Sequence, residues 1–325
     1  MKRHLWWTGL ALALLVPSLS VAQAYPARSI SMVVPFPPGG LADITARQFA
    51  PALERVLKQP VVIANRPGAA GTTGAYFVAN AAPDGYTVLL HLVSMSSLPE
   101  VDKLFGRPPV FTREQFAPIA RLNAEPPLLV VHPSIPSKNL KEFVALAKSR
   151  PGEMIFTSSG PYGASHVPYE MFLQAAGLKM RHLPTTGGGP AMTAVLGGHA
   201  VTWATPAAIA SPHIKAGKVK VLAHWGLKPM PEYPGVPSLM DHGYKVEFYQ
   251  WAGFFAPRNV PAGVFSTLRE ATRQVALNDA EFKKAMDKAL APVAYQDADE
   301  FKPWWDKDAE KIAAVVKRIG KVTDK

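Results

Sequence analysis

Short apolar segments alternate along the chain with loops rich in glycine and proline, and each loop runs into an amphipathic helical segment. The first unit contains the apolar run 30–34, the loop 35–40 and a helical segment over 43–57 with its apolar residues on one face. Similar units follow the apolar runs 61–64 and 87–92. Because strands that alternate with helices form parallel sheets in most folds, this pattern predicts an α/β protein with parallel sheets.

The second half of the chain repeats the pattern. Further strands are predicted over 128–131 and 154–156, and further helices are predicted over 140–148, 167–176, 261–277, 280–289 and 299–319. A chain of 325 residues is long enough for two domains.

The first 24 residues have the form of a secretory signal peptide. Lys2 and Arg3 precede the apolar run 5–16, and Ala22-Gln23-Ala24 matches the small-residue pattern of a signal peptidase site. The apolar run is shorter than the roughly 20 residues that a membrane span requires, which argues against the alternative of an uncleaved anchor. We therefore expect cleavage after Ala24 and a periplasmic mature protein.

The composition restricts the class of protein. With 48% hydrophobic residues, 18% charged residues and no cysteine, the chain is neither a disordered protein nor a disulfide-stapled or cysteine-ligated zinc module. The formal net charge is +11, but the cations are scattered along the chain without interleaved aromatic residues. We therefore expect no nucleic-acid partner, and a positive surface that steers small anions toward a cleft.

Three glycine-rich loops are candidate anion-binding segments: 35–40, 158–166 and 185–190. Each follows an apolar run or opens a helical segment, where unpaired backbone N–H groups can contact an anion. In open α/β sheets, ligands also bind beyond the carboxyl ends of the strands. The alternative interpretation of each loop is a tight turn without a ligand.

Sequence signatures of enzymes and metal sites are missing. The chain contains no G-x-S-x-G, no H-E-x-x-H and no P-loop, and Gly68, Gly71 and Gly74 do not have the spacing of a dinucleotide-binding loop. No two histidines after the leader have close ligand spacing. We expect no catalytic residue, no metal and no cofactor.

Several motifs together resemble a known family. They are Tyr25-Pro26-Ala27-Arg28, Val33-Val34-Pro35-Phe36-Pro37-Pro38-Gly39-Gly40 with Asp43 and Arg47, Asn65-Arg66-Pro67-Gly68, Pro83-Asp84-Gly85-Tyr86-Thr87, Leu129-Val130-Val131-His132-Pro133, Leu196-Gly197-Gly198 and Trp251-Ala252-Gly253. In this order they resemble the Bug family, the extracytoplasmic solute receptors of tripartite tricarboxylate transporters, and the resemblance covers essentially the whole mature chain.

The resemblance implies a fold, a ligand class and a partner. The fold is a type II periplasmic binding protein, with two α/β lobes joined by a hinge and a ligand cleft between them. We expect residues 25–127 and 250–325 to form the first lobe and residues 128–249 to form the second. The implied ligand is a small organic acid, and the implied partners are integral-membrane transporter subunits.

The expected ligand-binding residues come from both lobes. They are Phe36, Gly39, Gly40, Leu41, Ala42, Ser94 and Ser96 in the first lobe, and Ser158, Gly160, Tyr162, Gly163, His166, Thr185 and Thr205 in the second. Ser94 and Ser96 are assigned to a loop after the strand 87–92.

The chain departs from the family pattern in the second lobe. Ser158, Gly160 and His166 match the family's Ser-x-Gly-x-Gly-Ser-x-x-His, but Tyr162 and Gly163 replace its second glycine and second serine. An aromatic ring at this place predicts a pocket that accepts an aromatic or apolar-bodied acid. Thr185-Thr186 stand where the family often has Tyr-Lys, which makes a tricarboxylate less suitable.

The sequence therefore predicts a monomeric receptor that captures a small acid by hinge closure, without catalysis. Two alternatives remain at this point. One is a sensory receptor that presents its bound solute to a membrane kinase. The other is a small-molecule enzyme on the same two-lobed scaffold.

Overall fold

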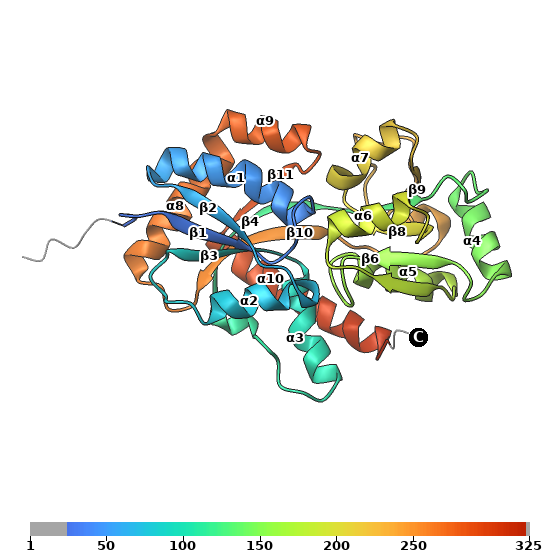
Figure 1. Cartoon of the computed structure of the whole chain (residues 1–325), viewed down its shortest axis with the longest axis horizontal. Coiled ribbons are helices and arrows are strands. Elements are labelled where there is room, and N and C mark those ends of the chain that lie inside the picture. Colours follow the sequence, from blue (N-terminus) through green and yellow to red (C-terminus); the bar gives the residue numbers. More distant parts are fainter. Residues whose placement is uncertain (1–24, 323–325) are drawn as a thin grey trace, which may run out of the picture.

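The computed structural model describes residues 25–322, and within them the chain forms two separate sheets (Figure 1). The expected leader, residues 1–24, lies outside the described residues. The first sheet has the order β11-β4-β10-β3-β1-β2. Its strands are β1 (Ile30–Val34), β2 (Val61–Asn65), β3 (Thr87–Leu92), β4 (Phe116–Glu125), β10 (Gln250–Pro257) and β11 (Val293–Asp297).

The second sheet has the order β7-β6-β8-β5-β9 within the described residues. Its strands are β5 (Leu128–Val131), β6 (Ile155–Ser158), β7 (Arg181–Pro184), β8 (Thr202–Thr205) and β9 (Lys220–His224). We call the elements around the first sheet the first lobe and those around the second sheet the second lobe.

Helices cover the faces of both sheets (Figure 1). In the first lobe these are α1 (Leu41–Leu57), α2 (Thr72–Ala79), α3 (Ser94–Leu104), α8 (Ala262–Asn278), α9 (Ala280–Lys288) and α10 (Ala298–Ile319). In the second lobe they are α4 (Leu140–Ser149), α5 (His166–Ala176), α6 (Gly188–Leu196) and α7 (Ala207–Lys215). Short 3-10 turns lie at Ala69–Gly71, Arg113–Gln115 and Met240–His242. No helix within residues 25–322 combines the length and apolarity that a bilayer span requires.

Both sheets are mixed, which corrects the expectation of parallel sheets. Strands β1, β2 and β3 run parallel, but β10 runs antiparallel to both β3 and β4. In the second sheet, β5 runs antiparallel to β8 and β9 while β6, β7 and β8 are parallel. Strand β11 also runs antiparallel to β4. Strands β5 and β10 are the ones by which the chain enters each sheet from the other lobe.

Two chain segments connect the lobes in the described residues. Strand β4 passes through Pro126 and Pro127 into β5, and the segment after β9 returns through Tyr249 into β10. At the crossing point, Gln250 is paired with Glu125 in the antiparallel ladder. The lobe boundaries expected from the sequence follow this division of strands and stay a prediction.

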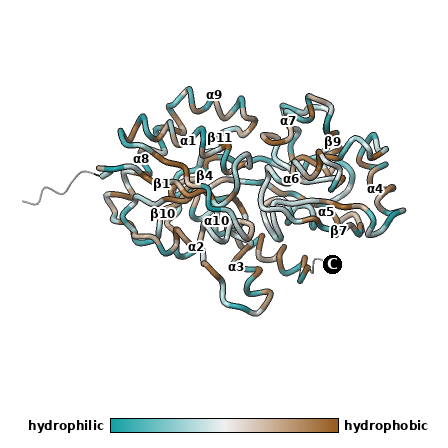
Figure 2. The backbone as a smooth tube through the Cα atoms, in the orientation of Figure 1, coloured by the Kyte–Doolittle hydropathy of each residue, from teal (hydrophilic) through white to brown (hydrophobic). Residues whose placement is uncertain are grey.

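The core of the first lobe is built from aromatic side chains between the sheet and α10. Trp251, Phe254 and Phe255 on β10 are buried, and Phe255 packs against Phe301 and Trp305 with ring centroids 5.6 and 5.0 Å apart. Figure 2 shows the corresponding pattern, with hydrophobic strands inside and hydrophilic outer turns of the helices. Burying each such ring contributes about 1.5–3 kcal/mol of hydrophobic stabilisation.

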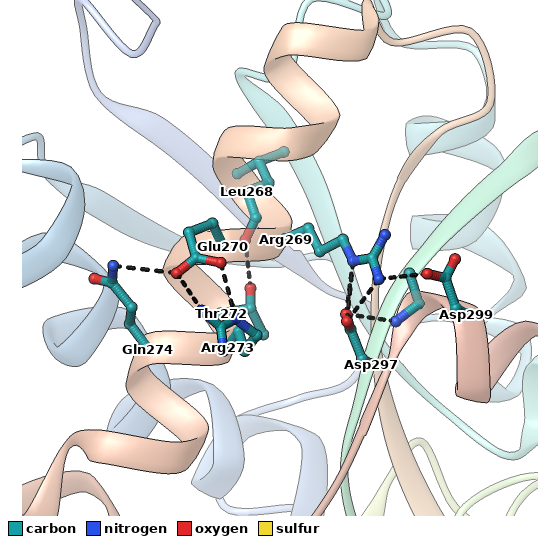
Figure 3. A network of polar contacts seen from close by, with 9 residues as sticks. Leu268, Arg269, Glu270, Thr272, Arg273, Gln274, Asp297 and Asp299 are labelled. Atoms are coloured by element: carbon teal, nitrogen blue, oxygen red, sulfur yellow. Dashed lines mark hydrogen bonds and ion pairs between the residues drawn. The ribbon is translucent and has the colours of Figure 1, made fainter.

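A polar network joins α8 to the start of α10 (Figure 3). The Arg269 guanidinium donates to both carboxylate oxygens of Asp297, at 2.7 to 3.1 Å, and to Asp299 at 2.6 Å. Asp297 is also the N-cap of α10, where its side chain accepts a hydrogen bond from the Ala298 N–H. Burial favours the neutral acid, but these hydrogen bonds outweigh burial and hold the pKa of Asp297 below its usual range.

Several elements were not assigned individually from the sequence. They are the strands β4, β7, β8, β9, β10 and β11 and the helices α3 and α7. The predicted loop containing Ser94 and Ser96 is wrong, because both residues lie in the first turn of α3.

Replacing Asp297 by alanine is expected to reduce the free energy of unfolding by about 1–2 kcal/mol, the usual effect of removing an N-cap. Because the folded-state pKa of Asp297 lies below its ordinary value of 3.8, the contribution is complete at neutral pH and is lost as the pH falls through the folded pKa. Urea unfolding of wild type and Asp297→Ala at pH 7 and at pH 3 to 4 measures this. Asp287→Ala, an exposed acid on α9, is the control. A difference that does not shrink at acid pH would contradict this interpretation.

Candidate ligand-binding site

A small cavity lies between the two lobes, beside the hinge. Its first-lobe lining is Phe36, Gly40, Leu41, Ala42, Leu92 and Gln250, and its second-lobe lining is Ser159, Ala164, Ser165, Gly188, Trp203, Pro206 and Ile209. The cavity volume is about 20 Å³, which is room for about one water molecule. A solute therefore enters only if the loops around the cavity move apart.

Four helices begin at this cavity. The N-cap or first residue of α1, α5, α6 and α7 is in each case part of the lining. None of these four helices has a hydrogen bond from an N-cap side chain. Helix N-termini carry partial positive charge and unpaired N–H groups, so their convergence favours an anionic guest.

The four N-termini are not equally available. In α5, the N–H groups of His166 and Val167 donate to the Gly163 carbonyl. In α7, the Ala207 N–H donates to the Glu125 carboxyl group. The helices α1 and α6, which follow Gly40 and Gly187 respectively, are therefore the ones best placed to donate to a ligand.

The loop that precedes α1 is held by Asp43. Its carboxylate accepts hydrogen bonds from the Gly39 N–H at 3.0 Å, from Arg47 at 2.7 Å and from Asn65 at 3.0 Å, and Asn65 also donates to the Phe36 carbonyl. Burial favours the neutral acid, but these donors outweigh it and lower the pKa of Asp43. Asp43 is therefore a negative charge already satisfied by the protein, and its role is to shape the loop.

The first-lobe loop agrees with the sequence-based expectation in four residues. Phe36, Gly40, Leu41 and Ala42 line the cavity. Gly39 lies behind them, with φ at +84° in the left-handed region that favours glycine, and turns the chain toward α1. Whether these residues contact a ligand stays a prediction.

The serines of the second-lobe loop differ in position from those expected. Ser158 lies behind the cavity, with its Oγ 2.7 Å from His182 Nε2 and 3.1 Å from the Gly160 carbonyl. Ser159 and Ser165 line the cavity instead, and the Ser165 Oγ accepts a hydrogen bond from the Ser159 N–H. The side chains of consecutive residues at a strand end point to opposite sides. The family pattern therefore identified the correct loop, but the hydroxyl that lines the cavity belongs to Ser159, the neighbour of the expected Ser158.

Tyr162 is outside the lining of the closed cavity, and the expectation that its ring shapes the pocket stays a prediction. Its hydroxyl donates to the Gly320 carbonyl at 2.8 Å and accepts from the Val322 N–H at 2.7 Å, just beyond the end of α10. Its carbonyl accepts from the Ser97 Oγ on α3. Tyr162 thus ties the second-lobe loop to two helices of the first lobe.

The backbone of the same loop shows why glycine is common there. Tyr162 has φ at +53°, and Gly160 has φ at +121°. A Cβ at Gly160 would lie 2.9 Å from the Cβ of Ala70 in the first lobe. Gly160 and Gly163 therefore allow a close approach between the lobes, and they are not part of the cavity lining.

His166 packs against the second-lobe loop and accepts a hydrogen bond from its backbone. It is fully buried at the start of α5, its Nδ1 accepts the Tyr162 N–H at 2.9 Å, and its ring lies 4.2 Å from that of His182, measured between centroids. Burial, and then the neighbouring His166, lowers the pKa of His182 to about 3. His182 is therefore neutral at physiological pH, and neither histidine lines the cavity.

Four further expected residues also lie outside the cavity lining. The Ser94 Oγ donates to the Ala70 carbonyl, and the Ser96 Oγ accepts from Trp305 Nε1 at 2.9 Å. Thr185 donates to the Ser158 carbonyl at 2.8 Å, and Thr205 lies 3.3 Å from the Pro206 carbonyl. These hydroxyls are satisfied by the protein itself.

Sequence reasoning did not select Trp203 or Gln250. The Gln250 side chain donates to the Ala164 carbonyl at 2.8 Å and so joins the lobes at the cavity. Trp203 is 1% exposed, and its indole N–H has no hydrogen-bond partner among the described residues. Such a buried donor is uncommon and suits a site that a ligand completes. The sequence signal for Trp203 is weak: its indole N–H is a polar group within the short strand Thr202-Trp203-Ala204-Thr205.

The loops of the two lobes touch above the cavity. A Cβ added at Gly187 would lie 2.5 Å from the Pro37 Cδ, and one at Gly40 would lie 3.5 Å from the Gly188 nitrogen. This is a closed arrangement. No group of three His, Asp or Glu side chains within residues 25–322 is placed to hold a metal ion.

Comparison with known proteins identifies the family. Residues 45–321 match the family model TctC, described as the tripartite tricarboxylate transporter family receptor. The chain is 34% identical to the protein BugT of Bordetella pertussis over 274 residues, which covers 83% of this chain and 81% of BugT. The chain belongs to this receptor family. Among solved structures, the periplasmic binding protein BugD is 30% identical with a TM-score of 0.85, covering 91% of this chain and 99% of BugD.

A second solved neighbour was determined with a ligand. MatC of Rhodopseudomonas palustris, with bound malate, is 26% identical with a TM-score of 0.83 and covers 90% of this chain and 100% of MatC. The family is one of transporter receptors, and BugD is a periplasmic binding protein. The receptor therefore has the two-lobed fold of a periplasmic binding protein, and its function is to bind a solute for a tripartite tricarboxylate-type transporter.

Replacing Tyr162 by phenylalanine is expected to lower the free energy of unfolding by about 0.5–1.5 kcal/mol, because two half-buried backbone groups, the Gly320 carbonyl and the Val322 N–H, lose a hydrogen-bond partner. The relative affinities for different ligands are expected to stay the same, because the ring does not line the cavity. Urea unfolding and ligand titration of Tyr162→Phe measure both quantities. Tyr76→Phe, at a side chain that is 52% exposed, is the control. A changed ligand preference would contradict this expectation and would support the direct contact between the Tyr162 ring and the ligand that the sequence suggested.

Proposed function

We propose that this receptor captures a small organic carboxylate of low charge in the periplasm, after removal of residues 1–24, and delivers it to a membrane transporter as a monomer. The observation that carries the proposal is the convergence of the α1 and α6 N-termini, neither of them capped by a side chain, on one closed cavity. The bound malate in MatC supports a carboxylate ligand.

The lining favours recognition of an anion without a counter-cation. It contains two serine hydroxyls, the unpartnered Trp203 indole N–H and the Gln250 amide, but no lysine, arginine or histidine. Backbone and hydroxyl donors in a water-poor cavity bind an anion strongly because the local dielectric is low. Each additional carboxylate would need further donors, so a mono- or dicarboxylate fits better than a tricarboxylate.

The proposed binding cycle follows from the closed loops. The lobes separate about the strands β4 and β10, the acid contacts the α1 N-terminus, and closure brings the α6 N-terminus and Ser165 against it. Closure is favoured only by contacts that are absent in the open form, so second-lobe donors determine how far the acid shifts the equilibrium. We propose the expected boundaries, 25–127 with 250–325 and 128–249, as the moving units.

We further propose that the solute leaves the receptor chemically unchanged. The lining contains two serines but no histidine, carboxylate or lysine that would act as their general base. Incubation with a bound acid followed by mass analysis is expected to return the acid intact.

A carboxylic acid is expected to raise the melting temperature of this receptor, and its amide is not. At 100 times the dissociation constant a ligand adds about 2.7 kcal/mol of stability, which corresponds to a shift of several degrees. The measurement is thermal unfolding of refolded, ligand-free protein with mono-, di- and tricarboxylic acids and their amides. Equal shifts with acids and amides, or no shift with any acid, would contradict the proposed anion site.

Replacing Gly187 by alanine is expected to weaken ligand binding about tenfold or more without unfolding the protein. The backbone at Gly187 is extended, so alanine adopts it freely, but its Cβ would lie 2.5 Å from Pro37 across the closed cavity. Overpacking costs about 1–3 kcal/mol, and here the cost falls on the closed form alone. Calorimetric titration of Gly187→Ala against Gly263→Ala, a position with open space on α8, measures the effect. Unchanged affinity would mean that binding does not close these loops.

A further inference from the structure

A second and larger cavity lies on the other side of the hinge strands. Its volume is about 670 Å³, within the range of small-molecule sites, which is about 300–1,000 Å³. It is lined by Arg121 and Ala124 of β4, Met171 of α5, the segment Glu247-Phe248-Tyr249, Ala294 of β11, and Trp304, Lys307, Asp308, Lys311, Ile312 and Val315 of α10. We call it the rear groove. It is formed by both lobes and by one of the segments that connect them.

The rear groove and the ligand cavity share the same connecting strands. Gln250 lines the ligand cavity, and its neighbour Tyr249 lines the rear groove. Ala124 lines the rear groove, while its neighbour Glu125 accepts the N–H of Ala207 at the start of α7. Consecutive residues of a strand face opposite sides. Rotation of the lobes that opens one cavity therefore narrows the other.

Three cations line the rear groove without an ion-pair partner. Arg121, Lys307 and Lys311 have no carboxylate within 4.0 Å among the described residues. The Arg121 Nε donates to the Ala294 carbonyl at 3.1 Å, and its guanidinium carbon lies 4.5 Å from the centroid of the Trp304 ring. Its remaining N–H groups have no acceptor among the described residues. Burial lowers the pKa of Arg121, and the negative charges of Asp308 and Glu300 offset this effect only in part.

Two carboxyl groups also line the rear groove, but neither forms an ion pair with these three cations. The Asp308 Oδ2 accepts a hydrogen bond from Trp251 Nε1 at 3.0 Å, so the protein itself satisfies part of that carboxyl group. Glu247 is exposed at the rim. Three cations against two carboxyl groups leave the lining of the groove with an excess of positive charge.

The rest of the wall is apolar and partly aromatic. Phe248 and Ile312 are buried, and Met171 and the half-buried Trp304 complete the wall. An arginine fork beside an aromatic ring binds a planar carboxylate in a bidentate manner, while an apolar wall accepts a hydrocarbon body. The ligand cavity lacks this combination, because no cation lines it.

We propose that the rear groove is a second ligand site, for an amphipathic organic carboxylate with an apolar chain or ring. Its carboxylate contacts Arg121, with Lys311 at the rim, and its apolar body lies along Trp304 and Phe248. Because the groove is open while the ligand cavity is closed, an occupant favours the closed form. By linkage, the site then acts as an effector site for the receptor.

Octanoate is the probe, and octanamide is its uncharged match. Isothermal titration calorimetry of the full mature protein is expected to show one octanoate per chain, with octanamide binding at least tenfold more weakly. Arg121→Gln is expected to reduce octanoate affinity at least tenfold. Lys311→Glu, at an exposed residue whose change leaves the core untouched, is expected to reduce affinity in the same direction. Lys317→Gln, another exposed cation of α10, is the control and is expected to bind like wild type.

The Lys311→Glu and Gly187→Ala variants together separate this site from the ligand cavity. Gly187→Ala disfavours the closed form, so by linkage it also weakens octanoate binding at the rear groove, whereas Lys311→Glu changes that groove alone. Octanoate binding that is reduced in Lys311→Glu supports the rear groove. Octanoate binding that is lost in Gly187→Ala and unchanged in both Arg121→Gln and Lys311→Glu overturns it, because octanoate then occupies the ligand cavity. Absence of octanoate binding at millimolar concentration also overturns the proposal, whatever the outcome for the ligand cavity.

Discussion

The antiparallel pairing of β4 with β10 is the constraint on which the rest of the structure depends. Both strands belong to the first sheet, and both lead into the second lobe. Asn123 fixes their register from within, because its Oδ1 accepts the Ala252 N–H at 2.9 Å and its amide lies 3.3 Å from the Thr45 hydroxyl of α1. The position of α1, and so of its N-terminus at the cavity, is thereby set by the same strands that form the hinge.

Glu125 shows what this arrangement costs. It is 3% exposed, its Oε1 has no hydrogen-bond partner among the described residues, and burial raises its pKa to about 8. An acid whose folded pKa lies above its unfolded value loses stability as the pH rises from the unfolded pKa toward the folded one. A hydrophobic residue would avoid that loss but would leave the Ala207 N–H without its partner. A costly buried acid at the hinge is typical of a functional position, where stability is sacrificed for function.

Those local elements that carry their own signal were predictable from the sequence. The strands 30–34, 87–92 and 128–131 are continuous apolar runs, and the structure contains all three. Strand β4 carries Pro118, Arg121 and Asn123 among its apolar residues, which conceals it. The direction of β5 and β10 was unpredictable for a different reason, since it depends on which lobe the chain arrives from and on no local preference.

The candidate site was predictable to the level of loops but not of side chains. The loops 35–40, 158–166 and 185–190 all reach the cavity region, because strand ends and helix starts are visible in the sequence. Sequence alone does not reveal that Ser159 replaces Ser158 in the lining, or that Tyr162 reaches the end of α10 about 160 residues away. Both outcomes depend on contacts between the lobes, which involve residues distant in sequence.

The distribution of charge suggests that attraction of anions to the surface and selection among them in the cavities depend on different groups. The chain has a net charge of +11, yet no cation lines the ligand cavity. In the proposed cycle the surface charge raises the rate at which anions arrive, while helix N-termini and hydroxyls hold the one that fits. Fixed dipoles discriminate by position, whereas a flexible lysine accepts many geometries. A cation placed beside apolar walls, as in the rear groove, selects instead for an anion with a hydrocarbon body, and the shared hinge strands make the two selections interdependent.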